Sequence, residues 1–262
     1  MSKVFLFDAA RCNGCHCCQV SCKDEFCGAD WAPYSKAQPE TGQFWCKVNQ
    51  ETRGSVPKVK VAYRVEIGAQ DDAIKDYAPE VLETREDGLV VIDPEKARGR
   101  KDLADRFEGV YWNDELGIPQ GCTGCAHLLD DGWDVPRCVD ACAMGALRFG
   151  DEADFADELA HAERLSEGSH VYYLNLPKRF VAGEVYDEEA DEVIIGATVT
   201  AVSENGERFE TTSDDFGDFW INDLAKGKYE VRFEAEGCLL RTLEADATDR
   251  DVNMGSIALY KG

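Results

Sequence analysis

The sequence predicts an α+β protein in which a cysteine-rich domain precedes a β-sandwich. Three observations carry this prediction. Cysteines gather in two groups, with seven of the 12 in residues 12–46 and four in 122–142. Short segments of alternating polarity fill the last third of the chain, as in a sheet with one wet face. Hydrophobic residues make up 44% of the 262 residues, enough to bury a core, which excludes extended disorder.

The composition also bears on partners and on location. The net charge of −24 would repel nucleic acid and anionic membranes. No apolar run reaches the roughly 20 residues of a membrane span, and the apolar stretch after Met1 is too short for a signal peptide. Clustered Cys-x-x-Cys pairs without an export signal indicate metal rather than disulfides. We therefore expect a cytoplasmic protein, or co-export with a partner that carries a signal.

The cysteine-rich domain is predicted to span residues 1–177, with a cysteine-free insertion at about 47–121. Period-two alternation and a short apolar run predict strands, whereas Asp93-Pro94-Glu95 is typical of a helix start. A helical apolar face predicts an acidic helix after the second group of cysteines. The expected elements are strands at 58–67 and 89–92 and helices at 95–107 and 151–166.

The second predicted domain covers residues 178–262 and begins just after Leu176-Pro177. Seven short alternating segments with glycines between or beside them are typical of a β-sandwich. The expected strands are 180–186, 193–202, 208–213, 218–222, 228–236, 239–246 and 252–259.

The first group of cysteines contains the run Cys12-x-x-Cys15-x-x-Cys18-x-x-x-Cys22. Thiolates are the soft, anionic ligands that iron–sulfur clusters require. In two-cluster ferredoxins, the fourth cysteine of such a run binds the other cluster. The run therefore predicts a ferredoxin-like domain with a second motif elsewhere in the chain.

That second motif is Cys122-x-x-Cys125, followed by Cys138 and Cys142. It fits the ferredoxin pattern with a loop inserted before its third cysteine. Exchange of the fourth ligands then predicts two [4Fe–4S] clusters. One would be held by Cys12, Cys15, Cys18 and Cys142, and the other by Cys22, Cys122, Cys125 and Cys138.

Two alternatives remain for these eight thiols, namely structural zinc and structural disulfides. The triple Cys-x-x-Cys-x-x-Cys run is less typical of a tetrahedral zinc site. Cys17, Cys27, Cys46 and Cys238 are expected to be buried or unreactive. For His127 we expect a helix-capping or surface role.

Through these two cysteine motifs, residues 1–175 resemble the electron-transfer subunits of molybdopterin oxidoreductases of the dimethyl-sulfoxide-reductase family. The resemblance is closest to the small subunits of pyrogallol–phloroglucinol transhydroxylases and catechol dehydroxylases. It rests on Asp30-Trp31-Ala32-Pro33-Tyr34, Thr41-Gly42-Gln43-Phe44-Trp45, Gly121-Cys122-Thr123-Gly124-Cys125-Ala126-His127 and Leu174-Asn175-Leu176-Pro177-Lys178-Arg179-Phe180. One departure is Ala143 after Cys142, where ferredoxin motifs commonly have proline.

The resemblance extends to the second domain, which is similar to transthyretin-like and carboxypeptidase-regulatory-like modules through Ile195-Gly196-Ala197 and Asp214-Asp215-x-Gly217. It implies a large catalytic partner that holds a bis-molybdopterin guanine dinucleotide molybdenum centre and acts on phenolic substrates. This chain would be a non-catalytic subunit that relays electrons, with an external electron donor as a further candidate partner. The alternatives are a free-standing ferredoxin-like carrier fused to an interaction module and a zinc-stabilised binding protein.

Overall fold

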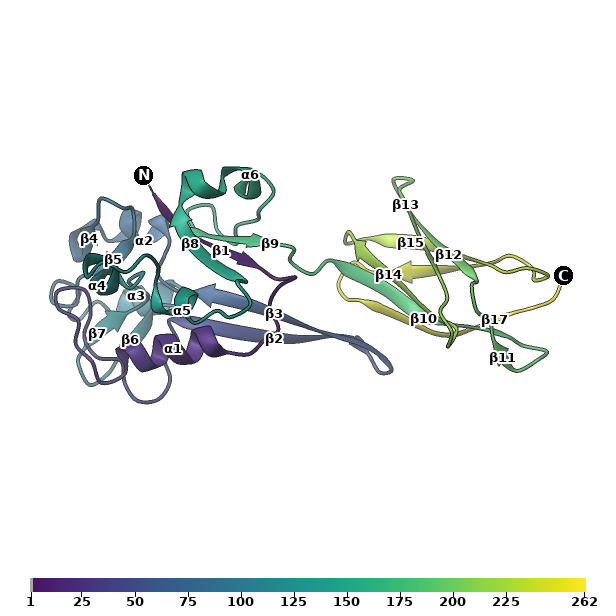
Figure 1. The fold of residues 1–262 in the computed structure, drawn as a ribbon, viewed down its shortest axis with the longest axis horizontal. Coiled ribbons are helices and arrows are strands. Elements are labelled where there is room, and N and C mark those ends of the chain that lie inside the picture. The colour runs from purple at the N-terminus through teal and green to yellow at the C-terminus, as the bar shows by residue number, and fades with distance from the viewer. Residues whose placement is uncertain (1) are drawn as a thin grey trace. The chain divides into compact units, whose positions relative to one another are not determined.

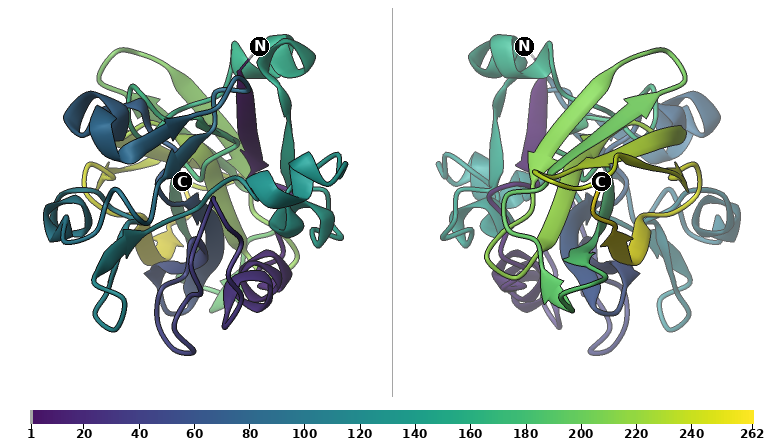
Figure 2. Two further views of the ribbon diagram at one scale, coloured as in Figure 1. Left: turned by 90° about the vertical axis from the view of Figure 1, so that its left-hand side faces the viewer. Right: turned by 90° about the vertical axis from the view of Figure 1, so that its right-hand side faces the viewer.

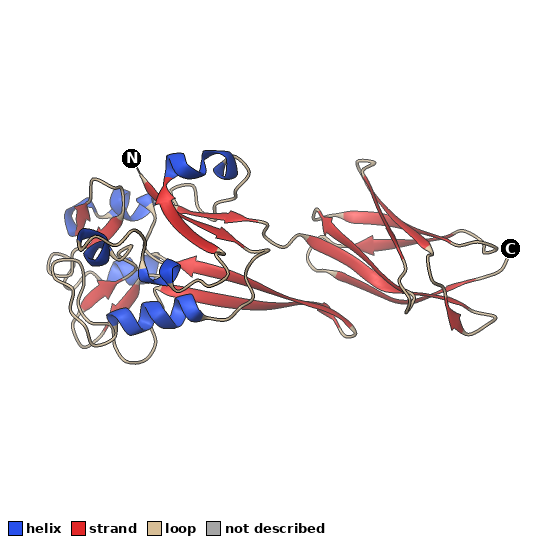
Figure 3. Ribbon diagram, viewed as in Figure 1, coloured by secondary structure: helices blue, strands red, loops and turns tan. Residues whose placement is uncertain are grey.

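A computed structural model describes residues 2–262, which form two compact units (Figure 1). The first unit contains residues up to Gln50 and Tyr63–Leu176, and the second contains Glu51–Ala62 and Pro177–Gly262. Helices lie in the first unit, whereas the second is built of strands (Figure 3). In the described part of the chain, no helix is both long enough and apolar enough to span a bilayer.

A three-stranded sheet forms the base of the first unit. Its central strand, β1 (Lys3–Asp8), pairs antiparallel with β8 (Leu147–Asp151) and parallel with β9 (Val171–Leu174). Four successive residues of β1 are buried, as expected for a strand covered on both faces. The phenyl rings of Phe5 and Phe7 are fully buried in a core that also holds most of the cysteines. The central strand of the sheet and these cysteines therefore share one hydrophobic core.

Three helices follow or overlap the cysteine motifs. They are α1 (Cys17–Phe26), α4 (Ala126–Asp130) and α5 (Arg137–Asp140). Helices α1 and α5 pack against each other. The hairpin of β2 (Cys46–Ser55) and β3 (Lys58–Ile67) starts in this unit, and its tip groups with the second unit. The predicted strand at 58–67 is confirmed.

The insertion has a small core of its own. It is formed by α2 (Asp72–Tyr77), η1 (Pro79–Val81), β4 (Leu82–Thr84), β5 (Val90–Ile92), α3 (Lys101–Arg106), β6 (Tyr111–Asn113) and β7 (Ile118–Gln120). Strand β5 confirms the short strand predicted near 89–92, and it pairs with β4.

Both predicted helices of this unit were too long. Asp93 does accept hydrogen bonds from the backbone N–H groups of Glu95 and Lys96, as a cap should. However, the chain then forms turns up to Gly99, whose φ of 81° is left-handed, and the helix covers only Lys101–Arg106. The acidic segment forms η2 (Glu152–Phe155) and α6 (Ala156–Leu159) and ends there.

The second unit is a sandwich of two four-stranded sheets, as predicted (Figure 2). In one sheet, β10 (Arg179–Asp187) pairs with β11 (Glu192–Val193), β14 (Asp218–Leu224) and β17 (Val252–Leu259). In the other, the order is β13 (Arg208–Thr212), β12 (Thr198–Ser203), β15 (Lys228–Glu234) and β16 (Arg241–Asp246). The predicted strand 193–202 is broken between β11 and β12, where Gly196 has a φ of 75°.

The core of the sandwich is formed by strands in which buried and exposed side chains alternate. In β15, Tyr229, Val231 and Phe233 are buried while their neighbours face outward. Each such side chain contributes about 1.5–3 kcal/mol on burial. At the hairpin tip, the guanidinium of Arg53 donates to both carboxylate oxygens of buried Asp251, at 2.7 and 3.0 Å. Both charged groups are buried, and their hydrogen bonds to each other compensate for the water that they have lost.

Candidate metal centres

The two Cys-x-x-Cys loops share one local structure. Each has a glycine at its second middle position, and Gly14 and Gly124 have φ values of 70° and 63°. A Cβ at Gly14 would lie 2.2 Å from the ring of Tyr63, and one at Gly124 would lie 2.6 Å from Leu89. Glycine is therefore required twice over, by the left-handed backbone and by the close neighbour. It allows a tight turn between the two thiols of each pair.

The first group of thiols, which we call site 1, consists of Cys12, Cys15, Cys18 and Cys142. All four line one hollow of the first unit, together with His16 and Met144. Cys15 is exposed, Cys12 and Cys142 are half-buried, and Cys18 is buried. Burial raises the pKa of the Cys12 thiol, and the neighbouring Cys18, Cys142 and Cys15 thiols raise it further. Site 1 thus joins three cysteines of the first motif to the last cysteine of the second.

The second group, which we call site 2, consists of Cys22, Cys122, Cys125 and Cys138. None of these residues is more than 8% exposed. Burial raises the pKa of the Cys22 thiol well above its ordinary value, and Cys138 and Cys122 add to the effect through their charge. Burial likewise raises the pKa values of Cys122 and Cys125, which also interact with Cys138. Site 2 therefore joins Cys22 to the first three cysteines of the second motif.

Helices α1 and α5 explain why each site combines cysteines from both motifs. Cys18 and Cys22 lie four residues apart on α1, so they share one face of the helix. Cys138 lies on α5, and Cys142 follows directly after its C-cap at Ala141. Because α1 and α5 pack together, each motif contributes to both sites.

The surroundings of the thiols fit iron–sulfur clusters. Backbone N–H groups of Gly124 and Leu147 donate to the sulfurs of Cys122 and Cys142, each at 3.3 Å, which stabilises thiolates. Within the described part of the chain, the buried donors Trp45 Nε1 and Thr123 Oγ1 have no hydrogen-bond partner. Thr123 lies inside the second loop, and Trp45 packs in the core that contains the thiols. Cluster sulfurs are acceptors, so this donor set suits them.

Residues 2–262 contain no group of three or more His, Cys, Asp or Glu side chains arranged around a single metal ion.

One buried residue beside the second cysteine loop escaped the sequence patterns. Gln70 is 1% exposed, and its amide donates to the carbonyls of Cys122 and Val90 at 2.7 and 2.8 Å. Its oxygen accepts from the backbone N–H of Val90 at 3.1 Å. Gln70 therefore ties the second cysteine loop to strand β5 of the insertion. No local motif signals such a residue, because both partners are distant in sequence.

Cys46, the first residue of β2, is 1% exposed, as expected for one of the four unassigned cysteines. It packs in the same buried core as Cys18, which belongs to site 1, and Cys138, which belongs to site 2. It lacks a Cys-x-x-Cys partner, so the sequence indicated only a buried cysteine. Of the other three unassigned cysteines, Cys17 is exposed and Cys27 and Cys238 are half-buried.

The expected surface or capping role of His127 was wrong. The imidazole is only 9% exposed, and Nε2 lies 3.0 Å from Oε1 of Glu25. Its ring stacks on Trp31, with 4.4 Å between the ring centroids and 15° between the planes. His127 is thus an interior side chain that packs helix α4 against α1 and the loop that follows it.

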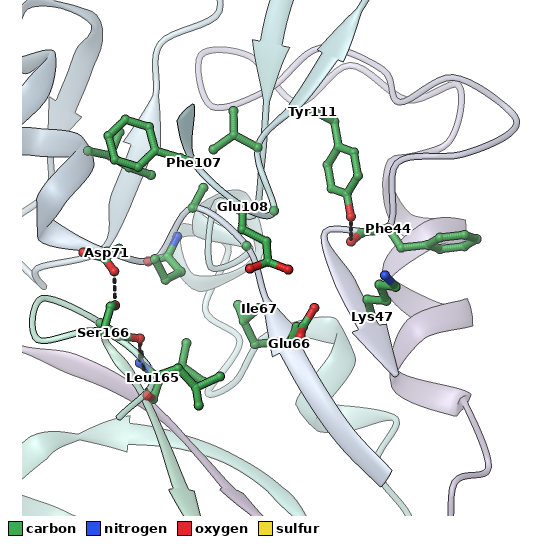
Figure 4. A pocket seen from close by; sticks show the side chains of 18 of the residues that line it. Phe44, Lys47, Glu66, Ile67, Asp71, Phe107, Glu108, Tyr111, Leu165 and Ser166 are labelled. Atoms are coloured by element: carbon green, nitrogen blue, oxygen red, sulfur yellow. Dashed lines mark hydrogen bonds between the residues drawn. The ribbon is translucent and has the colours of Figure 1, made fainter. Parts of the chain in front are cut away.

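A cavity of about 710 Å³ lies elsewhere in the first unit (Figure 4). Charged side chains of both signs line it, among them Lys47, Glu66, Asp71 and Glu108. Tyr111 closes part of its wall by donating to the carbonyl of Phe44 at 3.1 Å. No cysteine of the described residues lines this cavity, so it is separate from both thiol sites.

Two protein-family models match the chain. One, described as a 4Fe-4S dicluster domain, matches residues 69–152, and the other, described as a carboxypeptidase regulatory-like domain, matches residues 181–259. These matches confirm the predicted fold class, a ferredoxin-like α+β domain followed by a transthyretin-like or carboxypeptidase-regulatory-like sandwich. The fold and the thiol groups define an iron–sulfur electron-transfer subunit.

Comparison with individual proteins identifies the family to which the chain belongs. The small subunit of pyrogallol hydroxytransferase from Pelobacter acidigallici is 32% identical over 274 residues, covering 97% of this chain and 98% of the relative. The B subunit of anaerobic dimethyl sulfoxide reductase from Escherichia coli K12 is 29% identical over 56% of this chain and 72% of its own length. The chain belongs to the family of iron–sulfur subunits of dimethyl-sulfoxide-reductase-type molybdoenzymes, as the sequence motifs predicted.

Among solved structures, 5-hydroxyisourate hydrolase from Klebsiella pneumoniae is 13% identical, with a TM-score of 0.27 over 32% of this chain and 91% of that one. This score is too low to bear on function.

Proposed function

We propose that this chain holds two [4Fe–4S] clusters and relays electrons to or from a molybdopterin catalytic subunit that acts on phenolic substrates. Cys12, Cys15, Cys18 and Cys142 would bind one cluster, and Cys22, Cys122, Cys125 and Cys138 the other. The observation that carries the proposal is the gathering of eight thiols into two groups of four, each drawing on both motifs. The domains 1–177 and 178–262 would serve as the relay and as an interface module, respectively.

The residues of this chain would prepare the sites for electron transfer. A bound [4Fe–4S] cluster supplies reversible uptake of one electron. Thiolates would occupy the ligand positions, and the backbone N–H groups of Gly124 and Leu147, which donate to the sulfurs of Cys122 and Cys142, would stabilise their charge. Helix α1 would present Cys18 to one site and Cys22 to the other, while α5 would present Cys138 and lead into Cys142. The chain would contribute transport and no substrate chemistry.

The partner and the substrate class follow from the relatives. The relative that aligns with nearly the whole chain is named as the small subunit of pyrogallol hydroxytransferase. By this likeness, the partner would be a large subunit with a bis-molybdopterin guanine dinucleotide molybdenum centre, and the substrate a catechol or polyhydroxylated aromatic compound. The reaction would be a dehydroxylation or a hydroxyl transfer.

The test is anaerobic purification of the tagged chain from its native host. Iron, sulfide, molybdenum and zinc would be measured, and EPR spectra recorded after reduction. We expect about eight iron and eight sulfide per chain and a co-purifying large subunit that contains molybdenum. A monomer with clusters but no partner would favour the free-standing carrier. Zinc without a cluster signal would favour a zinc-stabilised binding protein.

A further inference from the structure

Six large apolar side chains are exposed at one end of the sandwich. Strand β10 begins at Arg179, and its last residue, Asp187, pairs with β11. This end is therefore the one away from Pro177, where the chain enters the unit, and it holds β11 and the C-terminus (Figure 1). The six residues lie in β11 and in the loops that follow β11, β13, β15 and β17, and each is between 42% and 76% exposed. We call them the end patch, and they are Val193, Ile195, Phe216, Leu239, Leu240 and Tyr260.

The loops that carry the end patch are joined to one another by hydrogen bonds. The hydroxyl of Ser213 donates to a backbone carbonyl in the loop after β11, at 2.6 Å. The carboxylate of Asp214 accepts from the backbone N–H of Phe216 at 2.9 Å, which fixes the turn that bears this phenyl ring. The backbone N–H of Leu239 donates to the carbonyl of Tyr260 at 2.8 Å. Because these turns are already fixed, little conformational entropy is lost when a partner covers them.

The end patch is surrounded by negative charge. Its loops hold eight carboxylates, five of them in residues 187–192, and a single cation, Lys261. That lysine is itself paired, since its Nζ lies 3.4 Å from a carboxylate oxygen of Asp187. An exposed apolar surface with a polar rim is typical of a protein interaction site. The loops in question are residues 187–196, 213–217, 235–240 and 260–262.

The charge of the rim indicates which partner fits. A second copy of this chain has the same acidic rim and the same net charge of −24, so two end patches would repel each other. An anionic membrane would be repelled for the same reason. The complementary surface is an apolar face surrounded by lysine and arginine, because potentials of opposite sign match across an interface.

We propose that the end patch is a docking surface for the large catalytic subunit, which meets it with an apolar face surrounded by lysine and arginine. This inference rests on the function proposed above, which supplies that subunit. Phe216 is the main anchor, because it is the most exposed of the six side chains and large aromatic residues contribute most to binding energy. The carboxylates of the rim attract the basic residues of the partner, and salt weakens this attraction.

The test measures the dissociation constant of the two subunits by mass photometry, after anaerobic purification through an N-terminal tag on this chain. Phe216→Asp and Leu240→Asp place a charge in the end patch, and we expect each to raise the dissociation constant by about tenfold or more. Val56→Asp is the matched control, because Val56 is 85% exposed at the hairpin tip, outside the end patch. It should bind like the wild type. All three side chains are exposed, so thermal unfolding should not change.

A second measurement tests the rim. The double variant Glu188→Lys with Asp215→Lys reverses two exposed charges beside the end patch. At low salt we expect its dissociation constant to rise by about tenfold, because its new charges face the basic residues of the partner. The difference from the wild type should shrink at about 0.5 M NaCl, where exposed charges are screened.

The outcomes separate the two proposals. If both end-patch variants bind the large subunit as tightly as the wild type and Val56→Asp do, the docking surface is overturned while the proposed function stands. If light scattering instead shows a dimer of this chain that Phe216→Asp dissociates, the occupant is a second copy and the inference is also overturned. If no large subunit co-purifies with the wild-type chain, the proposed function fails, and this inference fails with it.

Discussion

Site 1 and site 2 are built from similar motifs, but they differ in their access to solvent. At site 1, Cys15 is exposed and two further thiols are half-buried. At site 2, all four cysteines are buried. The insertion contributes to the burial of site 2, since Leu89 packs against Gly124 and the side chain of Gln70 donates to the carbonyl of Cys122.

The largest expected effect is the loss of a whole cluster. Cys15→Ser and Cys125→Ser should each remove about four of eight iron, because a hydroxyl is a poor replacement for a thiolate. Cys125→Ser should also lower the thermal stability of the first unit, since that side chain is only 3% exposed. Iron analysis, EPR and thermal unfolding measure both effects. Equal stability of the two variants would contradict the difference in burial.

The next largest expected effect tests how much Gln70, a residue of the insertion, contributes to stability. Gln70→Leu should destabilise the first unit by about 3–5 kcal/mol, because three buried backbone groups lose their partner. The matched control is Gln19→Leu, which removes one hydrogen bond, to the backbone N–H of Val48. We expect about 1 kcal/mol there. Denaturant unfolding of the holoprotein gives both values, and similar costs would refute the special role of Gln70.

A smaller effect tests the tight turn at site 2. Gly124→Ala should cost about 2–3 kcal/mol, because its Cβ meets Leu89 and its backbone is left-handed. Gly28→Ala is the control, since its φ is also positive, at 69°, but a Cβ there meets nothing within 4 Å. We expect about 1 kcal/mol for the control. Chemical denaturation measures the loss of unfolding free energy in both variants. Equal losses would show that the contact with Leu89 is unimportant.

The smallest expected effect concerns the rates at which an iron chelator removes the two clusters. An iron chelator should remove the cluster at site 1 faster than the cluster at site 2, by about tenfold or more, because local opening is needed to reach a buried site. The two EPR signals would be followed over time under anaerobic conditions. Loss of both signals at one rate would mean that burial does not protect site 2.

The sequence predicted elements whose signal is local. The strands of the sandwich alternate because each has one wet face, and β17 (Val252–Leu259) was predicted with its observed bounds. Helix lengths could not be predicted in the same way. The start signal at Asp93 is present, yet the left-handed turn at Gly99 separates it from α3. Likewise, the insertion showed single elements but not that they form a core of their own.

The candidate ligands could be chosen from spacing alone, because cluster-binding motifs are local runs of cysteine. Their assignment to individual clusters stays a prediction. Gln70 could not be found in this way, because the carbonyl of Cys122 to which it donates lies 52 residues away in sequence. The same holds for His127, whose interior position depends on Glu25 and Trp31 of a distant segment.

The exchange of fourth ligands is the central claim, and it can be tested by asking which cluster each variant loses. Cys22→Ser and Cys142→Ser would be prepared beside Cys15→Ser and Cys125→Ser, with the remaining cluster identified by its EPR signal and potential. We expect Cys142→Ser to match Cys15→Ser and Cys22→Ser to match Cys125→Ser. If Cys22→Ser instead loses the same cluster as Cys15→Ser, each motif binds its own cluster, and the crossed assignment is contradicted.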